Sequence, residues 1–331
     1  MYTICLGQFG NDQSITKTGT TVAQFLKIGM DARSTSMGGA VAGQNGNLSG
    51  VYWNPASLAS YNGIGVQFGS YDWLVAMKYQ FAIIGIDLGS KGVLGLSIVN
   101  LSSPDDLVRT VSEPQGTGEK FSTNDLSASL TYSKMLTDHF SLGGSFKYIQ
   151  QNIWHSTAHT VAIDIGTLFQ TPFYGTRLGA SISNYGGKMK MDGRDQKISI
   201  DPDLDNQGNV EFVNAIYETE HFPLPLFFRV GVSGELIKKQ NLKLSYGIDA
   251  LHPNDNTEHL NLGLELNYRE ILFLRGGIPS FYKMDSIEGP TFGAGLNYHM
   301  TRTATLLKID YSFSSYGPLG DVERLSIGFN F

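Results

Sequence analysis

An acidic segment near residue 200 has part of the ligand spacing of a calcium-binding loop. Asp201, Asp203 and Asp205 place carboxylates at positions one, three and five, which are ligand positions in such loops. Glycine falls at position eight instead of six, and Phe212 stands at position twelve, where a bidentate glutamate is expected. We therefore favour a solvated acidic external loop for residues 201–209, with calcium binding as the alternative.

The other residues with suitable chemistry do not form a recognisable catalytic or metal-binding motif. The seven histidines include no His-Glu-x-x-His pattern. His155 and His159 are four residues apart, which in a strand spans about 13 Å and is too far for easy shared ligation. Ser280 and Lys283 match Ser-x-x-Lys by letters only, and Gly116–Lys120 lacks the spacing of a phosphate-binding loop. We therefore predict no catalytic, cofactor-binding or metal-binding residues, no cofactor and no enzyme activity.

Six charged residues in the second half of the chain alternate with apolar neighbours. They are Glu235, Lys243, Asp249, Glu265, Lys308 and Asp310. Because their signs are mixed, we expect them to pair across neighbouring strands on one shared face, with an ion path as the alternative. Either arrangement requires a sheet that has a polar face.

From about residue 62 onward, segments of about ten residues alternate apolar with small or polar residues, the pattern of strands with two different faces. In one segment Leu260, Leu262 and Leu264 lie on one face, and Asn261 and Glu265 lie on the other. A soluble sandwich alternates in the same way. However, the polar face is rich in Gly, Ser and Asn, and tyrosines gather near segment ends, as in the aromatic girdle of a membrane barrel. The pattern therefore favours a barrel whose apolar face contacts lipid.

About fourteen such segments are present, an even number, as closed bacterial barrels require. They lie near 63–71, 76–87, 92–100, 124–134, 139–150, 157–169, 175–184, 226–237, 241–250, 259–268, 271–278, 290–300, 303–314 and 322–331. The two long connections, 101–123 and 185–225, both follow odd-numbered segments, so they emerge at one end, as the external loops of outer-membrane barrels do. The sequence therefore predicts an all-β transmembrane barrel of about 14 antiparallel strands over residues 62–331, in the bacterial outer membrane.

The overall composition excludes several other classes of protein. The net charge is −6 and no basic run is present, so nucleic-acid binding is not expected. The longest strongly apolar stretch, Phe81–Ile86, is far shorter than the ~20 residues that a membrane-spanning helix needs. Residues 1–18 lack both a basic region and a full apolar core, so we expect them to be flexible or the remnant of a leader.

Residues 34–71 contain no Asp, Glu, Lys or Arg, although Ser, Gly, Asn and Gln are frequent there. Such a segment suits neither a soluble surface nor a lipid-facing strand, so we expect residues 19–61 to form an N-terminal hatch inside the barrel. Arg33 is the last charge before this stretch, and a buried arginine needs a carboxylate partner. We expect that partner to be an inward-facing Asp164 or Glu265.

Two short helices are expected within the hatch. The spacing of apolar residues over Thr20–Ile28 is helical, with Thr20 or Thr21 as the capping residue. A second helix is expected after Asn54, which would cap it, with Pro55 at the first helical position.

Several motifs spread along the chain resemble those of the PorV/PorQ family of outer-membrane proteins. They are Gly19–Ala40, Tyr52–Ala59, Leu224–Gly231, His252–Asp255, His259–Gly263, Leu274–Gly277 and Lys308–Tyr311. The resemblance covers nearly the whole chain, from about Gly19 to Phe331.

The resemblance implies a fourteen-stranded barrel similar to the FadL long-chain fatty-acid transporters, with an N-terminal plug. It also implies a role in type IX secretion, in which such a barrel binds the C-terminal signal domain of exported cargo. We therefore predict binding of secreted cargo, or of a secretion-complex partner, through the external loops 101–123 and 185–225. The alternative is FadL-like transport of a hydrophobic small molecule across the outer membrane. The expected contacts are outer-membrane lipid and a protein partner, with a single-chain barrel inside a larger assembly.

Overall fold

The computed structural model describes residues 17–173, 175–202, 212–283, 286–300 and 305–331. Most of the predicted leader remnant falls on residues 1–16, and most of the calcium-like segment falls on residues 203–211. Both of these stretches lie outside the described residues, so the two predictions are untested.

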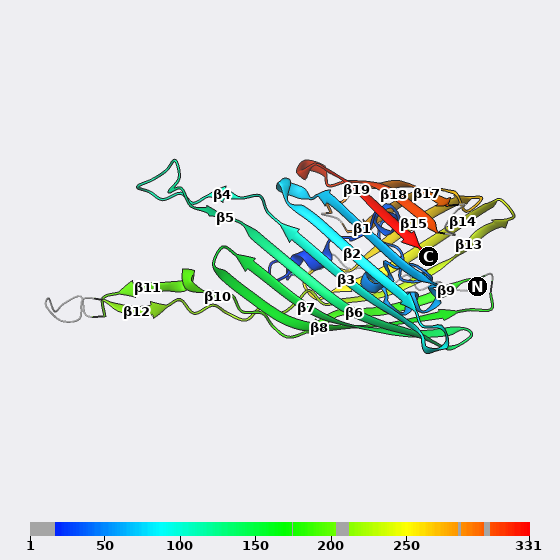
Figure 1. Ribbon diagram of the computed structural model, residues 1–331, viewed down its shortest axis with the longest axis horizontal. Helices are drawn as coiled ribbons and strands as arrows, with labels where there is room; N and C mark the ends of the chain where they lie inside the picture. The colour runs from blue at the N-terminus through cyan, green and yellow to red at the C-terminus, as the bar shows by residue number, and fades with distance from the viewer. Residues whose placement is uncertain (1–16, 174, 203–211, 284–285, 301–304) are drawn as a thin grey trace, which may run out of the picture.

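Fourteen of the described strands form one closed antiparallel barrel (Figure 1). They are β1 (Ile64–Asp72), β2 (Lys78–Asp87), β3 (Val93–Ser102), β6 (Thr123–Thr137), β7 (Phe140–Ile153), β8 (Ser156–Gln170), β9 (Arg177–Gly186), β13 (Phe227–Lys239), β14 (Leu242–Pro253), β15 (His259–Tyr268), β16 (Leu272–Phe281), β17 (Thr291–His299), β18 (Leu306–Ser315) and β19 (Asp321–Asn330). Each pairs with its neighbour in sequence, and β1 closes the barrel by pairing with β19, with Gly65 opposite Asn330. Every predicted strand is therefore confirmed, with boundaries that differ by three residues or fewer.

The two faces of each strand differ in the way that the alternation predicts. On β15, Leu264 is 50% exposed on the outside of the barrel, whereas Glu265 faces the lumen and is 6% exposed. Large apolar side chains recur on the outer face of the other strands as well, among them Ile98, Phe146 and Phe292. An apolar outer band of this extent is a surface for lipid.

The long connections leave the barrel at one end, as the order of loop lengths predicts. The connection from β3 to β6 carries β4 (Asp106–Leu107) and β5 (Lys120–Phe121). The connection from β9 to β13 carries β10 (Asp192–Gly193), the 3₁₀ turn η5 (Arg194–Gln196), β11 (Lys197–Ile200) and β12 (Val213–Ile216). Figure 1 shows both connections reaching far beyond the barrel on the same side, opposite the C-terminus. We call that side the loop end, and the side of Phe331 the turn end.

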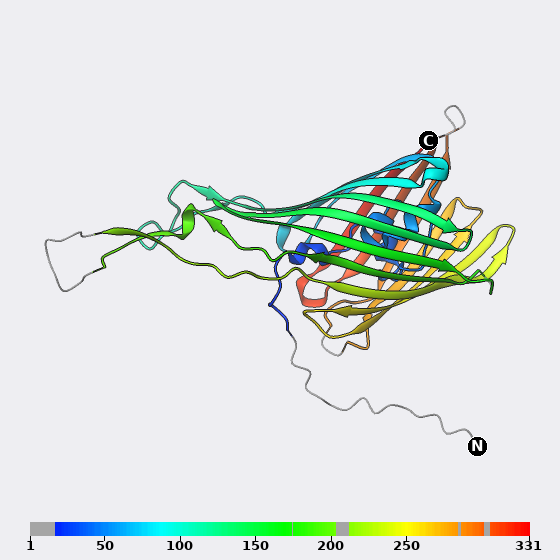
Figure 2. The ribbon, with the colours of Figure 1, turned by 90° about the horizontal axis from the view of Figure 1, so that it is seen from below.

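Residues 21–61, here called the lumenal segment, lie inside the barrel (Figure 2). They form η1 (Gln24–Lys27), α1 (Ala32–Ser36), α2 (Gly50–Trp53) and η2 (Pro55–Ser60), and much of the segment is buried. Other short turns, η3 (Leu74–Ala76), η4 (Gly89–Lys91) and η6 (Gly317–Leu319), connect strands. None of the described helices is long and apolar enough to cross a membrane.

Glycines of the barrel wall let the lumenal segment approach the strands directly. A Cβ added at Gly277 would collide with the backbone nitrogen of Gly38, and one added at Gly179 would collide with the carbonyl oxygen of Ala42. Only glycine permits such a close approach of two backbones. The high glycine content of the polar face therefore reflects packing of backbone on backbone inside the barrel.

The lumenal segment agrees with one helix prediction and contradicts the other. Asn54 caps η2 by accepting a hydrogen bond from the Ala56 N–H at 3.1 Å, as expected. The helix predicted over Thr20–Ile28 is wrong, because only the single 3₁₀ turn η1 forms there. Ala23 precedes this turn at φ 54°, and the Thr21 hydroxyl, expected as a cap, donates instead to Asp255.

Candidate functional site

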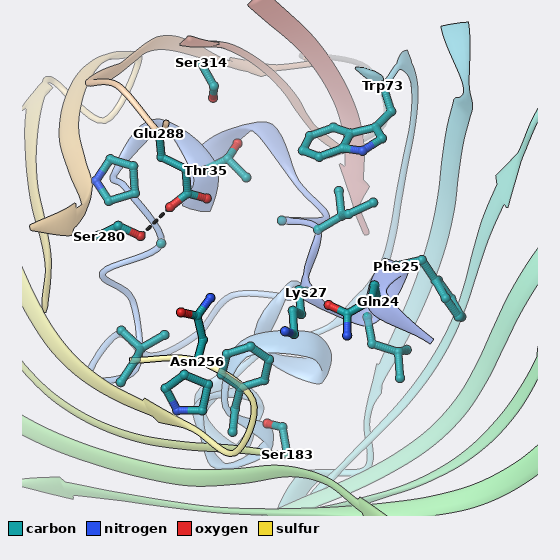
Figure 3. A pocket seen from close by; sticks show the side chains of 18 of the residues that line it. Gln24, Phe25, Lys27, Thr35, Trp73, Ser183, Asn256, Ser280, Glu288 and Ser314 are labelled. Atoms are coloured by element: carbon teal, nitrogen blue, oxygen red, sulfur yellow. Dashed lines mark hydrogen bonds between the residues drawn. The ribbon is translucent and has the colours of Figure 1, made fainter. Parts of the chain in front are cut away.

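A cavity of about 840 Å³ lies at the loop end of the lumen, between the lumenal segment and the barrel wall (Figure 3). Its apolar lining includes Phe25, Leu26, Trp53, Trp73, Leu101, Phe227, Leu251 and Ile287. Its polar lining includes Lys27, Ser183, Asn256, Ser280 and Glu288. Figure 3 shows Trp73 and Phe25 on one side of the space, facing Ser280 and Glu288 on the other. A concave apolar space with a few polar groups is the usual form of a small-molecule site.

Three tyrosines fix the stretch of the lumenal segment that borders this cavity. The Tyr52 hydroxyl donates to the carbonyl oxygens of Leu26 at 2.8 Å and Ile28 at 2.6 Å. The Tyr71 hydroxyl donates to Gly29 at 2.8 Å, and the Tyr79 hydroxyl lies 3.4 Å from the Ile28 carbonyl oxygen. Burial raises the pKa of Tyr52 well above its ordinary value, so its hydroxyl keeps its proton and remains a donor. All of these bonds end on backbone carbonyl oxygens of residues 26–29, so they do not depend on the side chains of that stretch.

A single carboxylate holds the neighbouring residues 21–27 from the loop end. Asp255, in the connection from β14 to β15, accepts from the Lys27 ammonium at 2.5 Å and from the Gln24 amide at 3.1 Å. Thr21 donates to the same carboxylate oxygen. Burial alone would raise the pKa of Asp255, but the donors, Lys27 first, outweigh it and hold the pKa below its usual value. The carboxylate therefore stays charged and links the lumenal segment to the loop end.

Arg229 of β13 lies at the cavity wall without a carboxylate partner. Its guanidinium stacks on the Trp53 ring at 4.9 Å and donates to the Trp53 carbonyl oxygen over a long 3.4 Å. In the described part of the chain, no carboxylate lies within ion-pair distance of this guanidinium. The arginine is thus held by an aromatic face, and it gives the apolar cavity one fixed polar group.

The expected ion pair of Arg33 forms with Glu265 and not with Asp164. Arg33 binds Glu265 through two bonds, of 3.1 Å and 3.2 Å, whereas Asp164 pairs with Lys147 at 2.6 Å. Burial opposes the charge on Arg33, but the Glu265 carboxylate outweighs it and the pKa of Arg33 is raised. Arg275, across from Glu265 in the strand register, binds the same carboxylate at 2.7 Å.

The six charged residues of the second half of the chain are expected to form ion pairs between neighbouring strands, and only some of them do. Asp310 accepts from Arg275 at 2.7 Å, but Arg275 lies two strands away. For Asp249 the expectation is wrong, because its carboxylate accepts from the backbone N–H groups of Val41 and Ala42, each at 2.9 Å.

The remaining members of this set also depart from pairing between neighbouring strands. Glu235 binds Lys238 of its own strand at 3.0 Å, and Lys243 binds Glu270 in a turn at 2.5 Å. Lys308 makes no ion pair with any described residue.

The structure separates the two histidines that the sequence places four residues apart. His155 contacts Asp195 at 2.9 Å and also contacts Arg194. His159 stacks on the Tyr148 ring instead, with centroids 6.5 Å apart. Among the described residues, no group of three or more His, Cys, Asp or Glu side chains is arranged to hold a metal ion.

Ser280, the serine of the Ser-x-x-Lys match, lies at the rim of the loop-end cavity, which the sequence does not reveal. The Ser280 hydroxyl donates to Glu288 at the rim of the cavity, and its backbone N–H donates to Asn261 at 2.9 Å. Ser280 has φ 52° and lies where the β15–β16 register shifts between Leu260 and Leu262. Its hydroxyl is thus committed to a carboxylate, in a bulge that shapes the cavity wall.

No family model matches the chain, and no curated protein matches it. Among solved structures, the chain is similar to the toluene transporter TbuX of Ralstonia pickettii, at 12% identity and a TM-score of 0.56, over 91% of this chain and 97% of that one. It is also similar to the monoaromatic hydrocarbon channel CymD (12% identity, TM-score 0.56, 92% of this chain and 98% of that one). A FadL homologue of Pseudomonas aeruginosa is a third (11% identity, TM-score 0.54, 95% of this chain and 99% of that one).

At these identities the likeness concerns the fold. It confirms the predicted fold, a closed barrel of 14 antiparallel strands similar to that of a FadL homologue. Membership of the PorV/PorQ family stays a prediction.

Proposed function

We propose that the barrel binds a hydrophobic small molecule in the loop-end cavity and passes it across the outer membrane. The single observation that carries this proposal is the 840 Å³ cavity, lined by aromatic and aliphatic side chains and closed below by the lumenal segment. Each 100 Å² of apolar surface that a ligand buries there contributes roughly 2.5 kcal/mol. The solved structures of similar fold include a transporter of toluene and a channel for monoaromatic hydrocarbons, which supports an apolar ligand.

Release of the ligand from the cavity requires residues 21–29 to move, because this stretch borders the cavity on the side of the barrel interior. Its polar attachments are hydrogen bonds from tyrosine hydroxyls, bonds to the Asp255 carboxylate, and bonds from the Val22 and Ala23 N–H groups to Pro223 and Gln151. Each neutral bond contributes only about 1 kcal/mol net. Residues 21–29 are therefore the part of the lumenal segment that we expect to open.

Tryptophan fluorescence gives a direct test of binding. Trp53 and Trp73 line the cavity, whereas Trp154 does not. In a Trp154→Phe background, 1-bromonaphthalene, whose bromine quenches indoles on contact, should quench the remaining fluorescence with saturation. Adding Ser183→Phe should weaken saturable quenching, because Ser183 lines the cavity and a phenyl ring would occupy part of it.

The matched control is Ile182→Phe, at the adjacent residue of β9, whose side chain is 41% exposed on the outer face. It should leave saturable quenching intact. Equal, non-saturating quenching in all three proteins would mean that the probe partitions into detergent and would contradict the binding proposal. Passage is tested by accumulation of the probe in cells, which should rise with expression of the wild-type chain and rise less with Ser183→Phe.

A second candidate function, docking of a protein partner, is supported by the two connections that extend from the loop end. β11 and β12 pair only with each other among the described strands, and an isolated two-stranded ribbon is marginally stable in water. This ribbon also exposes Ile216 and the adjoining Tyr217 at 62% and 64%. The resemblance to the PorV/PorQ family would make the partner a secreted cargo protein or a secretion complex.

The docking candidate is tested by excising residues 197–216. The Tyr217 N–H donates to the Gln196 carbonyl oxygen at 2.9 Å, so the two ends of the excised ribbon are already adjacent. Affinity purification from outer membranes should recover secreted proteins with a common C-terminal domain only when the ribbon is present. Unchanged recovery without the ribbon would contradict docking at this site. The excision should leave 1-bromonaphthalene binding intact, which separates the two candidate functions.

A further inference from the structure

A second cavity, of about 170 Å³, lies near the turn end of the lumen. Arg33 and Asn47 of the lumenal segment line one side of it, and residues of β1 and β16–β19 line the other. No described residue lines both this space and the loop-end cavity. The second cavity is therefore a separate site, for which the proposed transport function assigns no role.

The charged groups around this cavity do not balance. Three cations, Arg33, Arg275 and Lys308, line the cavity together with one carboxylate, Asp310, and the Glu265 carboxylate lies within ion-pair distance of both arginines. Glu265 is bound by both arginines, and Asp310 is bound by Arg275. Lys308 makes no hydrogen bond or ion pair with another described residue, so its ammonium group is the excess charge.

The strand register leaves room beside that ammonium group. Lys308 of β18 lies directly between Asn297 of β17 and Gly328 of β19, and Gln67 of β1 follows Gly328 in the same row. Gly328 has no side chain to fill the space next to Lys308. The amide groups of Asn297 and Gln67 line the cavity, and neither makes a side-chain hydrogen bond with a described residue. Three polar side chains with N–H donors are thus unpartnered along one row of the barrel wall.

An ammonium group partly withdrawn from bulk water is stabilised by an anion that accepts its hydrogen bonds. The volume of the cavity corresponds to five or six water molecules, at about 30 Å³ each, which is enough for a phosphate or a carboxylate. We propose that the turn-end cavity is a binding site for a small oxyanion, a carboxylate or a phosphate, with Lys308 as the charged contact and Asn297 and Gln67 as neutral donors.

Calorimetric titration of the full-length protein in a zwitterionic detergent tests this site. Inorganic phosphate and acetate are the free-ion probes, and dihexanoyl phosphatidic acid is the probe for a lipid headgroup. Lys308→Gln keeps a polar side chain with N–H donors, one atom shorter, but removes the charge. Because a hydrogen bond to a charged group contributes about 1.5–3 kcal/mol, the variant should bind at least one of these probes about tenfold more weakly or worse.

The matched control is Lys91→Gln, which removes the same charge in an exposed turn at the same end of the barrel. Weaker binding in Lys308→Gln with unchanged binding in Lys91→Gln supports the site. Binding of phosphatidic acid without binding of the free ions would identify a lipid headgroup as the source of the anion. Three results would overturn the proposal: no binding of any probe at millimolar concentration, equal binding by wild type and Lys308→Gln, or an equal loss in both variants. Bromonaphthalene quenching, unaffected by Lys308→Gln, confirms that the barrel is folded.

Discussion

The two parts of the lumenal segment are attached to the barrel by different kinds of interaction. Residues 21–29 are held by hydrogen bonds with tyrosine hydroxyls, Asp255, Gln151 and the Pro223 carbonyl oxygen, all of which water can replace, and by the burial of Phe25, Leu26 and Ile28. Residues 31–61 are held by the buried Arg33–Glu265–Arg275 cluster and by backbone packed directly on strand glycines. The second kind of attachment cannot be released without leaving a buried charge or an empty space. We call residues 21–29 the cover and residues 31–61 the plug. The comparison teaches that one segment can be movable in one part and fixed in another, depending on how each part is anchored.

Spin labels placed in each part report on the comparison directly. The label sites are Val22→Cys in the cover and Ser60→Cys in the plug. Each is placed in a Cys5→Ser background, because Cys5 is the single cysteine of the sequence and would also take the label. In the wild-type barrel, we expect the label at residue 22 to be the more mobile of the two. Greater mobility at residue 60 than at residue 22 would reverse the proposed assignment of cover and plug.

The largest expected effect comes from Glu265→Gln. The substitution leaves Arg33 with a neutral partner and Arg275 with Asp310 as its remaining carboxylate, and breaking a largely buried ionic cluster costs up to about 3–5 kcal/mol. The urea-unfolding free energy of the barrel should fall by that amount, and the label at residue 60 should become mobile. Glu235→Gln is the control. Among the described residues, Glu235 forms its ion pair with Lys238 of its own strand, so the variant should change stability by less than about 1 kcal/mol.

The sequence predicts the ionic anchor but not the rest of the comparison, and the reason is physical. Arg33 borders a long uncharged stretch, so its need for an inward carboxylate is visible from composition, and strand alternation shows that Glu265 faces inward. The strands themselves are predictable because alternation with a period of two is a local signal, visible within each segment of the sequence. The sequence does not show that Arg33 pairs with Glu265 and not with Asp164. In the structure, Asp164 of β8 forms its ion pair with Lys147 of the neighbouring strand β7.

The cover and the cavities are not predictable, because their residues meet only in three dimensions. The helical spacing over Thr20–Ile28 is overridden by bonds from Tyr52, Tyr71 and Asp255, which are between 24 and 234 residues away. The loop-end cavity takes its lining from most of the strands and from several loops. No local pattern marks such a space.

A smaller effect is expected when the backbone contact of the plug is disturbed. Gly277→Val places a side chain where the backbone of Gly38 lies, and overpacking of this kind costs typically 1–3 kcal/mol. The urea-unfolding free energy should fall by that amount, and the label at residue 60 should become more mobile than the label at residue 22. Gly144→Val is the control, because the nearest atom to an added Cβ at Gly144 is an ordinary 3.7 Å away. A similar loss in both variants would mean that strand propensity, and not the plug contact, sets the cost.

A still smaller effect is expected for Tyr71→Phe, which removes one hydrogen bond to the cover. The loss is about 1 kcal/mol, and it should appear as greater mobility at residue 22 with no change at residue 60. The ring of Tyr71 also stacks on Tyr79, with centroids 4.9 Å apart, and phenylalanine retains that contact. Loosening of residue 60 by this variant would show that cover and plug move as one body and would break the comparison.

The smallest effect is a dependence on pH that is confined to the cover. Lys27, Gln24 and Thr21 hold the pKa of Asp255 below its ordinary 3.8, so the contribution of this carboxylate is fully present above pH 3.8 and is lost as the pH falls through the lowered value. The label at residue 22 should therefore have equal mobility at pH 7 and pH 5 and become more mobile below about pH 4. Asp255→Asn should be mobile at every pH and should lose the transition. Among the described residues, the ion pair of Glu258, in the same connection, is with His252, so Glu258→Gln should retain the transition. A transition that survives in Asp255→Asn would assign it to another group and would remove Asp255 from the attachments specific to the cover.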